Sequence, residues 1–237
     1  MTFSPYEKLP GKFSTNDGTI DFYLRVRTYL DKKKVVLDLG AGSGEWFKNK
    51  NIEVRREVQF IKKKVKKLYG ADIDRNVLKN KSTHKNFLIK NNKIPLKKES
   101  IDIIVSDWTF EHIQHPKAFY FEINRVLKKN GIICFRTPHK FNYFALINSI
   151  IEGTILKNIL LNKSQPDRGK YFKSFYKLNT ITTIKKVFKN YDLEYLLFKP
   201  DPAYFFGSKV VFYFFLFLHK ILPNFFSGAI FGFLKKK

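Results

Sequence analysis

The chain has 237 residues, 44% of them hydrophobic, and it contains one cysteine, Cys134. This composition excludes a disulfide scaffold and wholesale disorder, and the length suits one α/β domain better than two. The net charge of +25 comes from 45 Lys and Arg against 20 Asp and Glu. It favours an anionic partner, or it reflects a bias toward AT-rich codons, which include those of lysine.

Residues 20–138 alternate between the patterns of buried strands and of amphipathic helices. Apolar spacing predicts helices over 20–30 and 119–127, and short apolar runs predict strands over 35–39, 68–73, 101–105 and 132–135. Asn130-Gly131 is expected to end the second helix, and the lysine-rich stretch 48–67 to be a solvated helix and loop. This alternation predicts an open, doubly wound, mostly parallel sheet.

The pattern changes after Pro138. Apolar stretches predict short helices over 142–151 and 154–161, then a helix over 180–189, a strand over 193–198 and a partner strand over 203–206. We therefore divide a single domain, 1–237, into a core at 20–138, a helical insertion at 139–180, a last helix and strand pair at 181–207, and an apolar tail at 208–237.

A glycine-rich turn follows the strand predicted at 35–39. Glycine lets the backbone approach a ligand closely, but Gly40, Gly42 and Gly44 give G-x-G-x-G, which is neither the dinucleotide fingerprint nor a phosphate loop. Asp38 would repel a pyrophosphate and attract a ligand with a cationic amino group and a sulfonium. Asp72, at the end of the next strand, can accept hydrogen bonds from ribose hydroxyls.

Residues 36–44 resemble motif I of the class I S-adenosylmethionine-dependent methyltransferases. The likeness continues in the same order through 70–74, 94–96, 100–106, 110–113, 122–127 and 131–133. These segments are similar to the small-molecule branch typified by ubiquinone- and menaquinone-biosynthesis methyltransferases. The resemblance implies a Rossmann-like, seven-stranded fold with a helical insertion, and S-adenosyl-L-methionine as the cofactor.

The resemblance also implies which residues hold the cofactor. It assigns the methionine side to Asp38, Gly40, Ala41, Gly42 and Gly44, the ribose to Asp72, the adenine face to Ile73, and further cofactor contacts to Asn91 and Asp107. The family usually has an acidic residue facing the adenine amino group, where this chain has Lys90-Asn91-Asn92-Lys93. Asn91 is our choice for that contact, although either asparagine carbonyl could accept the bond.

Three histidines on loops are candidates for a general base that accepts a proton from a hydroxyl acceptor. His112 and His139 each follow the end of a predicted strand, and His115 ranks third. The alternative for each is a solvated or locally hydrogen-bonded side chain. No metal site is predicted.

Base-modifying activity does not fit the sequence. Ser106-Asp107-Trp108-Thr109 lacks the paired prolines of enzymes that methylate exocyclic base amines. Enzymes that methylate carbon 5 of pyrimidines need a nucleophilic cysteine, whereas Cys134 lies within a predicted strand and is expected in the core. An RNA methyltransferase is therefore an alternative supported only by charge. A non-catalytic binding or assembly protein on the same fold is another.

The second half of the sequence bears on the acceptor. Residues 171–180 resemble a tyrosine-rich segment of a bacterial methyltransferase subgroup, and we expect either an acceptor lid or scaffold packing. Residues 208–237 are apolar but interrupted by Lys220 and Pro223, so they suit an anionic membrane interface, or packing on the sheet or a second copy. We expect O-methylation of a small or lipid-linked acceptor by a cytoplasmic enzyme with peripheral membrane contact.

Overall fold

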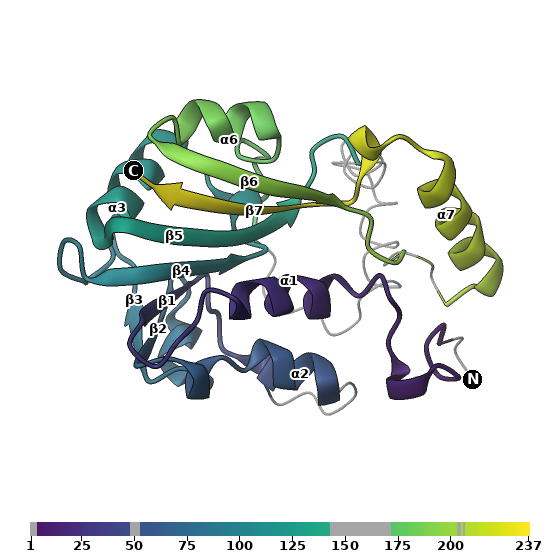
Figure 1. Cartoon of the computed structure of the whole chain (residues 1–237), viewed down its shortest axis with the longest axis horizontal. Coiled ribbons are helices and arrows are strands. Elements are labelled where there is room, and N and C mark those ends of the chain that lie inside the picture. Colours follow the sequence, from purple (N-terminus) through teal and green to yellow (C-terminus); the bar gives the residue numbers. More distant parts are fainter. Residues whose placement is uncertain (1–3, 48–52, 143–171, 203–204, 206) are drawn as a thin grey trace.

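The structure is a computed structural model that describes residues 4–47, 53–142, 172–202, 205 and 207–237 (Figure 1). The helices predicted over 142–151 and 154–161 lie almost entirely outside these residues. The strand predicted over 203–206 lies mostly outside them as well.

One seven-stranded sheet forms the centre of the molecule, in the order β3-β2-β1-β4-β5-β7-β6. Its strands are β1 Val35–Leu39, β2 Lys67–Asp72, β3 Lys85–Leu88, β4 Ile101–Asp107, β5 Leu127–Pro138, β6 Tyr191–Phe198 and β7 Ala229–Lys236. All neighbouring pairs among β1 to β5 are parallel, whereas β7 is antiparallel to both β5 and β6. The predicted Rossmann-like, mostly parallel sheet is therefore confirmed. Strand β3 was not predicted, because its four residues lack a strong apolar pattern.

Helices cover both faces of the sheet (Figure 1). On one face lie α1 Gly18–Arg27 and α2 Glu53–Gln59, and on the other lie α3 Pro116–Val126 and α6 Ile181–Val187. Strand β1 shows how the sequence produces this layering. Val36 packs into the core beneath α1 and α2, and Leu37 packs into the core beneath α3 and α6. Both side chains are fully buried, as expected for a strand covered on both faces.

Helix α3 ends earlier than the sequence indicated. Its last residue is Val126, and β5 begins at Leu127. Asn130 adopts a left-handed conformation with φ of 58°, which asparagine tolerates better than most residues, but it lies in the irregular first part of β5. The prediction that Asn130-Gly131 ends the helix is therefore wrong by four residues.

The C-terminal apolar segment divides into two parts. Helix α7 Lys209–Ile221 lies beyond the carboxyl ends of the parallel strands, whereas β7 runs back between β5 and β6 (Figure 1). Ile230, Phe231 and Leu234 of β7 are completely buried, so its apolar sequence reflects an interior strand and not a tail. The partner strand of β6 is β7, in contrast to the prediction of a partner at 203–206. None of the described helices combines the length and apolarity needed to cross a membrane.

Candidate active site

The turn after β1 uses glycine for two different reasons. Gly40, Gly42 and Gly44 all have positive φ angles, of 81°, 51° and 72°. A Cβ atom at Gly40 would overlap the side chain of Thr109, and one at Gly44 would overlap Asn80, whereas one at Gly42 would meet open space. Packing thus requires glycine at 40 and 44, and the turn presents an uncovered backbone at 42.

Asp72 is held next to this turn by backbone donors. Its Oδ2 accepts a hydrogen bond from the Gly42 nitrogen at 2.9 Å, and its Oδ1 accepts one from the Asp74 nitrogen at 2.8 Å. The neighbouring Ile73 side chain is 62% exposed. The carboxylate therefore has a fixed position at the end of β2, with an apolar side chain beside it.

A cavity of about 420 Å³ lies against these residues. Its polar lining comes from Gly40, Asp72, Asn92, Thr109, His112, Gln114, His115, Glu122 and Lys173, and its apolar lining from Leu39, Ile73, Ile89, Ile94, Ile113, Phe119, Ile123, Phe172 and Phe175. The chain passes from β1 to neighbours on both sides here, and such a switch point is where doubly wound sheets bind ligands. Among the predicted site residues, Gly40, Asp72, Ile73, His112 and His115 meet at this cavity.

Asp38 lies behind the cavity, within β1. Burial, followed by the nearby carboxylates of Asp107 and Asp72, raises the pKa of its carboxyl group to about 7. A cation bound close to these three groups would favour the ionised form of Asp38. The cluster is therefore suited to the positively charged end of a ligand.

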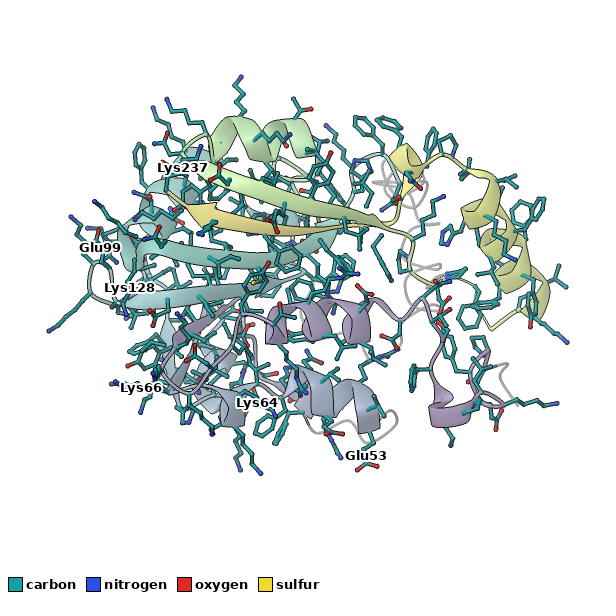
Figure 2. The ribbon with its side chains drawn as sticks, viewed as in Figure 1. Glu53, Lys64, Lys66, Glu99, Lys128 and Lys237 are labelled. Carbon is teal, nitrogen blue, oxygen red and sulfur yellow. The ribbon has the colours of Figure 1, made fainter. Side chains whose placement is uncertain are left out.

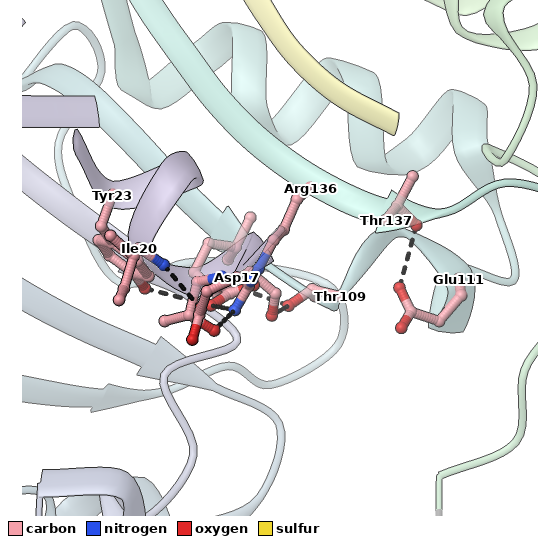
Figure 3. A network of polar contacts seen from close by, with 10 residues as sticks. Asp17, Ile20, Tyr23, Thr109, Glu111, Arg136 and Thr137 are labelled. Carbon is pink, nitrogen blue, oxygen red and sulfur yellow. Dashed lines mark hydrogen bonds and ion pairs between the residues drawn. The ribbon is translucent and has the colours of Figure 1, made fainter. Parts of the chain in front are cut away.

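Asp107 is already engaged in a buried ion pair. Arg136 of β5 binds both of its carboxylate oxygens, with Nη2 at 2.8 Å from Oδ2, and the Tyr23 hydroxyl lies 3.3 Å from the same oxygen. Arg136 also donates to Thr19 Oγ1 of α1 at 3.1 Å. Figure 3 shows Arg136 and Tyr23 within this network. This network ties β4, β5 and α1 together. The network was not predicted from the sequence, although a charged residue within an apolar strand was a visible signal.

The remaining cofactor candidates fall around the cavity without lining it. Ala41 is buried within the turn, and Asn91 belongs to the tight turn closed by the bridge between Lys90 and Lys93. Asn92, the other asparagine of that turn, lines the cavity. The contact proposed for Asn91 therefore fits Asn92 better by position.

His112 has one ring nitrogen engaged and one directed elsewhere. Its Nδ1 lies 3.0 Å from the carbonyl oxygen of Lys173, and a carbonyl can only accept, so Nδ1 carries the hydrogen. The Nε2 atom of the neutral ring then has a free lone pair. Such a nitrogen can accept a proton from a ligand in the cavity.

His139 stands apart from this group. Its ring packs edge-on against Phe141 and Phe225, with centroids 5.5 Å and 5.9 Å away. Burial lowers the pKa of the His139 imidazole, which favours the neutral ring. Since His139 does not line the cavity, the structure brings together His112 and His115 but not His139.

Residues 172–177 cover one side of the cavity. Phe172, Lys173 and Phe175 line it, and the backbone nitrogens of Phe175 and Tyr176 donate to the carbonyl oxygen of Glu111 at 2.7 Å and 3.2 Å. This end of the predicted insertion is therefore fastened to η5 Phe110–His112. Residues 143–171 of the insertion lie outside the described residues.

The methyltransferase-domain family matches residues 15–197, more than half of the chain. The chain belongs to this family. The match, together with the shared fold, confirms the prediction of an S-adenosylmethionine-dependent methyltransferase.

Known proteins are similar to this methyltransferase in sequence or in fold, at low sequence identity. Malonyl-[acyl-carrier protein] O-methyltransferase 2 of Ilyobacter polytropus is 25% identical over 162 residues, which cover 61% of this chain and 59% of that protein. The YcgJ protein of Bacillus subtilis has a TM-score of 0.55 at 14% identity, covering 92% of this chain and 98% of its own. An S-adenosylmethionine-dependent methyltransferase of Archaeoglobus fulgidus has a TM-score of 0.53 at 17% identity, covering 92% of each chain.

Proposed function

We propose that this methyltransferase methylates an oxygen atom of a small or lipid-linked acceptor held at the His112 end of the cavity. The observation that carries the proposal is that one cavity is lined by two sets of residues. Gly40 and Asp72 belong to the set that we call the donor end, and His112, His115 and the aromatic side chains of Phe172 and Phe175 to the set that we call the acceptor end.

The residues of the first end fit the methyl donor. The open backbone at Gly42 leaves room for a ligand, Asp72 can accept from ribose hydroxyls, and Ile73 offers an apolar surface to a base. The buried carboxyl of Asp38 suits the cationic methionine end. When bound, S-adenosylmethionine supplies an electrophilic methyl group on a positively charged sulfur.

The residues of the second end would position the acceptor and receive its proton. Alignment of two reactants can supply about 7–11 kcal/mol of rate acceleration, and a general base adds roughly 10²–10⁴-fold. His112 lines the cavity, and the hydrogen bond from its Nδ1 to the Lys173 carbonyl leaves Nε2 as the unprotonated nitrogen of the neutral ring. His112 is therefore our proposed base for a hydroxyl acceptor. A carboxylate acceptor would need no base.

Oxygen as the methylated atom is supported by the curated relative, whose name states an O-methyltransferase activity. The chain spans 59% of that protein's length, so its acceptor is not transferred to this chain. RNA is less well supported as the acceptor. The labelled lysines Lys66, Lys128 and Lys237 lie at the end of the sheet away from α7 (Figure 2), whereas the cavity is lined by residues at the carboxyl ends of the parallel strands.

We further propose that α7 brings the enzyme to an anionic membrane surface. Val210, Tyr213, Phe214, Phe217 and Ile221 are all more than half exposed and follow helical spacing along one side. The opposite side of α7 buries Phe212 and His219. Exposed lysines at both ends of the helix, Lys209 and Lys220, would meet anionic headgroups. The helix lies beyond the carboxyl ends of the parallel strands (Figure 1), and the cavity is lined by residues at the same ends, which favours a lipid-linked acceptor.

Transfer of a ¹³C-labelled methyl group tests the acceptor. The full chain is incubated with labelled S-adenosylmethionine and, separately, with a lipid extract, an aqueous metabolite extract and total RNA. We expect label in one of the first two, with a methyl shift typical of oxygen. Alkaline release as methanol would identify an ester, and resistance an ether. Label in RNA alone, or on nitrogen, would overturn the proposal.

Flotation with vesicles tests the role of α7. Deleting 208–237 would remove the central strand β7, so the variant is Phe214→Ser with Phe217→Ser. We expect the natural chain to float with phosphatidylglycerol vesicles, the variant to lose most of this binding, and neither to float with phosphatidylcholine. Equal flotation of both proteins would refute the role of the helix.

A further inference from the structure

We propose that Glu111 is a positioning residue that stabilises the protonated form of His112 after His112 has taken a proton from the acceptor. This inference rests on the proposed O-methylation, in which His112 is the base. Glu111 does not line the cavity, and it was not among the residues predicted from the sequence.

The geometry around His112 places Glu111 at the reactive nitrogen. The Lys173 carbonyl holds the hydrogen on Nδ1, and the Oε1 atom of Glu111 lies 3.9 Å from Nε2. A small movement of the half-exposed His112 ring would bring these atoms to hydrogen-bonding distance. The Glu111 carboxylate therefore lies near Nε2, which would take up the proton, and not near Nδ1, which is already bonded to the Lys173 carbonyl.

A chain of hydrogen bonds holds the other oxygen of Glu111. Asn179 Nδ2 donates to Thr137 Oγ1 at 2.8 Å. Thr137 Oγ1 donates in turn to Glu111 Oε2 at 3.1 Å (Figure 3). Asn179 Nδ2 is also 2.8 Å from the Pro138 carbonyl oxygen, which fixes the amide at the end of β5. All three side chains are buried. The donors point toward Glu111, which is the arrangement that an ionised carboxylate needs.

The surroundings keep this carboxyl close to its protonation point. The pKa of Glu111 is raised to about 7, because the effect of burial and of the Asp107 charge exceeds the lowering by the Thr137 hydrogen bond and the Arg136 charge. An imidazolium beside it would favour the carboxylate, because opposite charges within about 4–6 Å stabilise each other. A charge on His112 would therefore be stabilised by the Glu111 carboxylate 3.9 Å away.

The proton balance of the step is then complete. The acceptor hydroxyl gives its proton to His112 Nε2, its oxygen forms the new bond to the methyl carbon, and the carbon–sulfur electron pair stays on sulfur. The resulting His112–Glu111 ion pair holds the proton until it is released to water. Glu111 thus acts through His112 without touching the acceptor.

Imidazole NMR of the full chain with bound S-adenosylhomocysteine tests the pair and needs no acceptor. We expect Glu111→Gln to move the protonation midpoint of His112 to lower pH by about one unit, and Glu111→Asp to move it less. The matched control is Glu122→Gln, because Glu122 also lines the cavity but is held by Arg125, with Nε 2.8 Å from Oε2. His84, whose Nδ1 accepts from the Leu68 nitrogen, serves as an internal reference that should not move.

Three outcomes decide between the proposals. A shift in Glu111→Gln alone, with cofactor-product binding retained by calorimetry, supports the pair. An unchanged His112 midpoint in both Glu111 variants overturns it and leaves the methyltransferase proposal intact. Failure of the natural chain to bind S-adenosylhomocysteine would instead overturn the proposed function. In that case the same titration without ligand would still show whether Glu111 stabilises protonated His112.

Discussion

The two ends of the cavity are built in different ways. At the proposed donor end the chain uses the backbone, with positive φ angles at three glycines and a carboxylate fixed by the nitrogens of Gly42 and Asp74. At the acceptor end it uses side chains from η5, the start of α3 and residues 172–175. The donor end therefore depends on local geometry that few substitutions preserve, whereas the acceptor end can change with the residues that line it.

The largest expected effect concerns the network beneath both ends. Removing one partner of a buried ion pair leaves the other charge uncompensated and costs about 3–5 kcal/mol. We expect Arg136→Met to lower the free energy of unfolding by that amount, since Arg136 is 5% exposed and binds Asp107. Urea unfolding measures the loss.

The matched control is Lys128→Met, which removes the partner of Asp102 from a half-exposed pair. Pairs of that kind contribute about 0–1 kcal/mol. Similar losses in the two variants would show that the Asp107–Arg136 pair does not anchor the strand ends.

Asp38→Asn separates stability from binding at the donor end. Because burial raises the folded-state pKa of Asp38 to about 7, the folded chain binds this proton more tightly than the unfolded chain. Its stabilising effect is complete below about pH 4 and is lost as the pH rises toward 7. Without ligand at pH 8, we expect Asp38→Asn to be more stable by about 2–4 kcal/mol.

The same substitution should weaken binding of S-adenosylhomocysteine, because a neutral amide attracts the ligand's ammonium group less than a carboxylate does. Thermal unfolding at pH 5 and pH 8, with and without the ligand, measures both effects. A natural chain whose stability does not fall over this pH range would contradict the account of Asp38.

Two alanine substitutions in the glycine turn should differ. Gly40→Ala adds a Cβ that overlaps Thr109 as well as straining a positive φ, so we expect a loss of about 3 kcal/mol. Gly42→Ala adds only the backbone strain, of about 1 kcal/mol, because open space surrounds its Cβ. Thermal unfolding compares the two, and equal losses would show that packing does not select glycine at position 40.

The smallest effect is expected on α7. Phe214 and Phe217 are 57% and 58% exposed, so the Phe214→Ser, Phe217→Ser variant should change the free energy of unfolding by less than about 0.5 kcal/mol for each substitution. Urea unfolding checks this. A loss of several kcal/mol would place these side chains in a packed interface.

The sequence predicted local features of the fold better than features that depend on contacts between distant segments. The strand, turn and carboxylate of residues 35–44 and 72 could be predicted, because their spacing along the chain is set by local backbone geometry. Strand β7 could not, because the short apolar run at 229–234 suits an interior strand and a membrane-contacting segment equally until its pairing with β5 and β6 is known. Glu111 was missed for a similar reason, since its partners Thr137 and Asn179 come from distant segments.

Calorimetric binding of S-adenosylhomocysteine tests the central claim most directly. The account predicts binding by the natural chain and a loss of more than about 100-fold in Asp72→Ala, because charged hydrogen bonds to two ribose hydroxyls contribute about 1.5–3 kcal/mol each. Asp74→Ala keeps the backbone nitrogen that binds Asp72 and should change affinity by less than about threefold. No binding by the natural chain, or equal affinity in Asp72→Ala, would contradict the account.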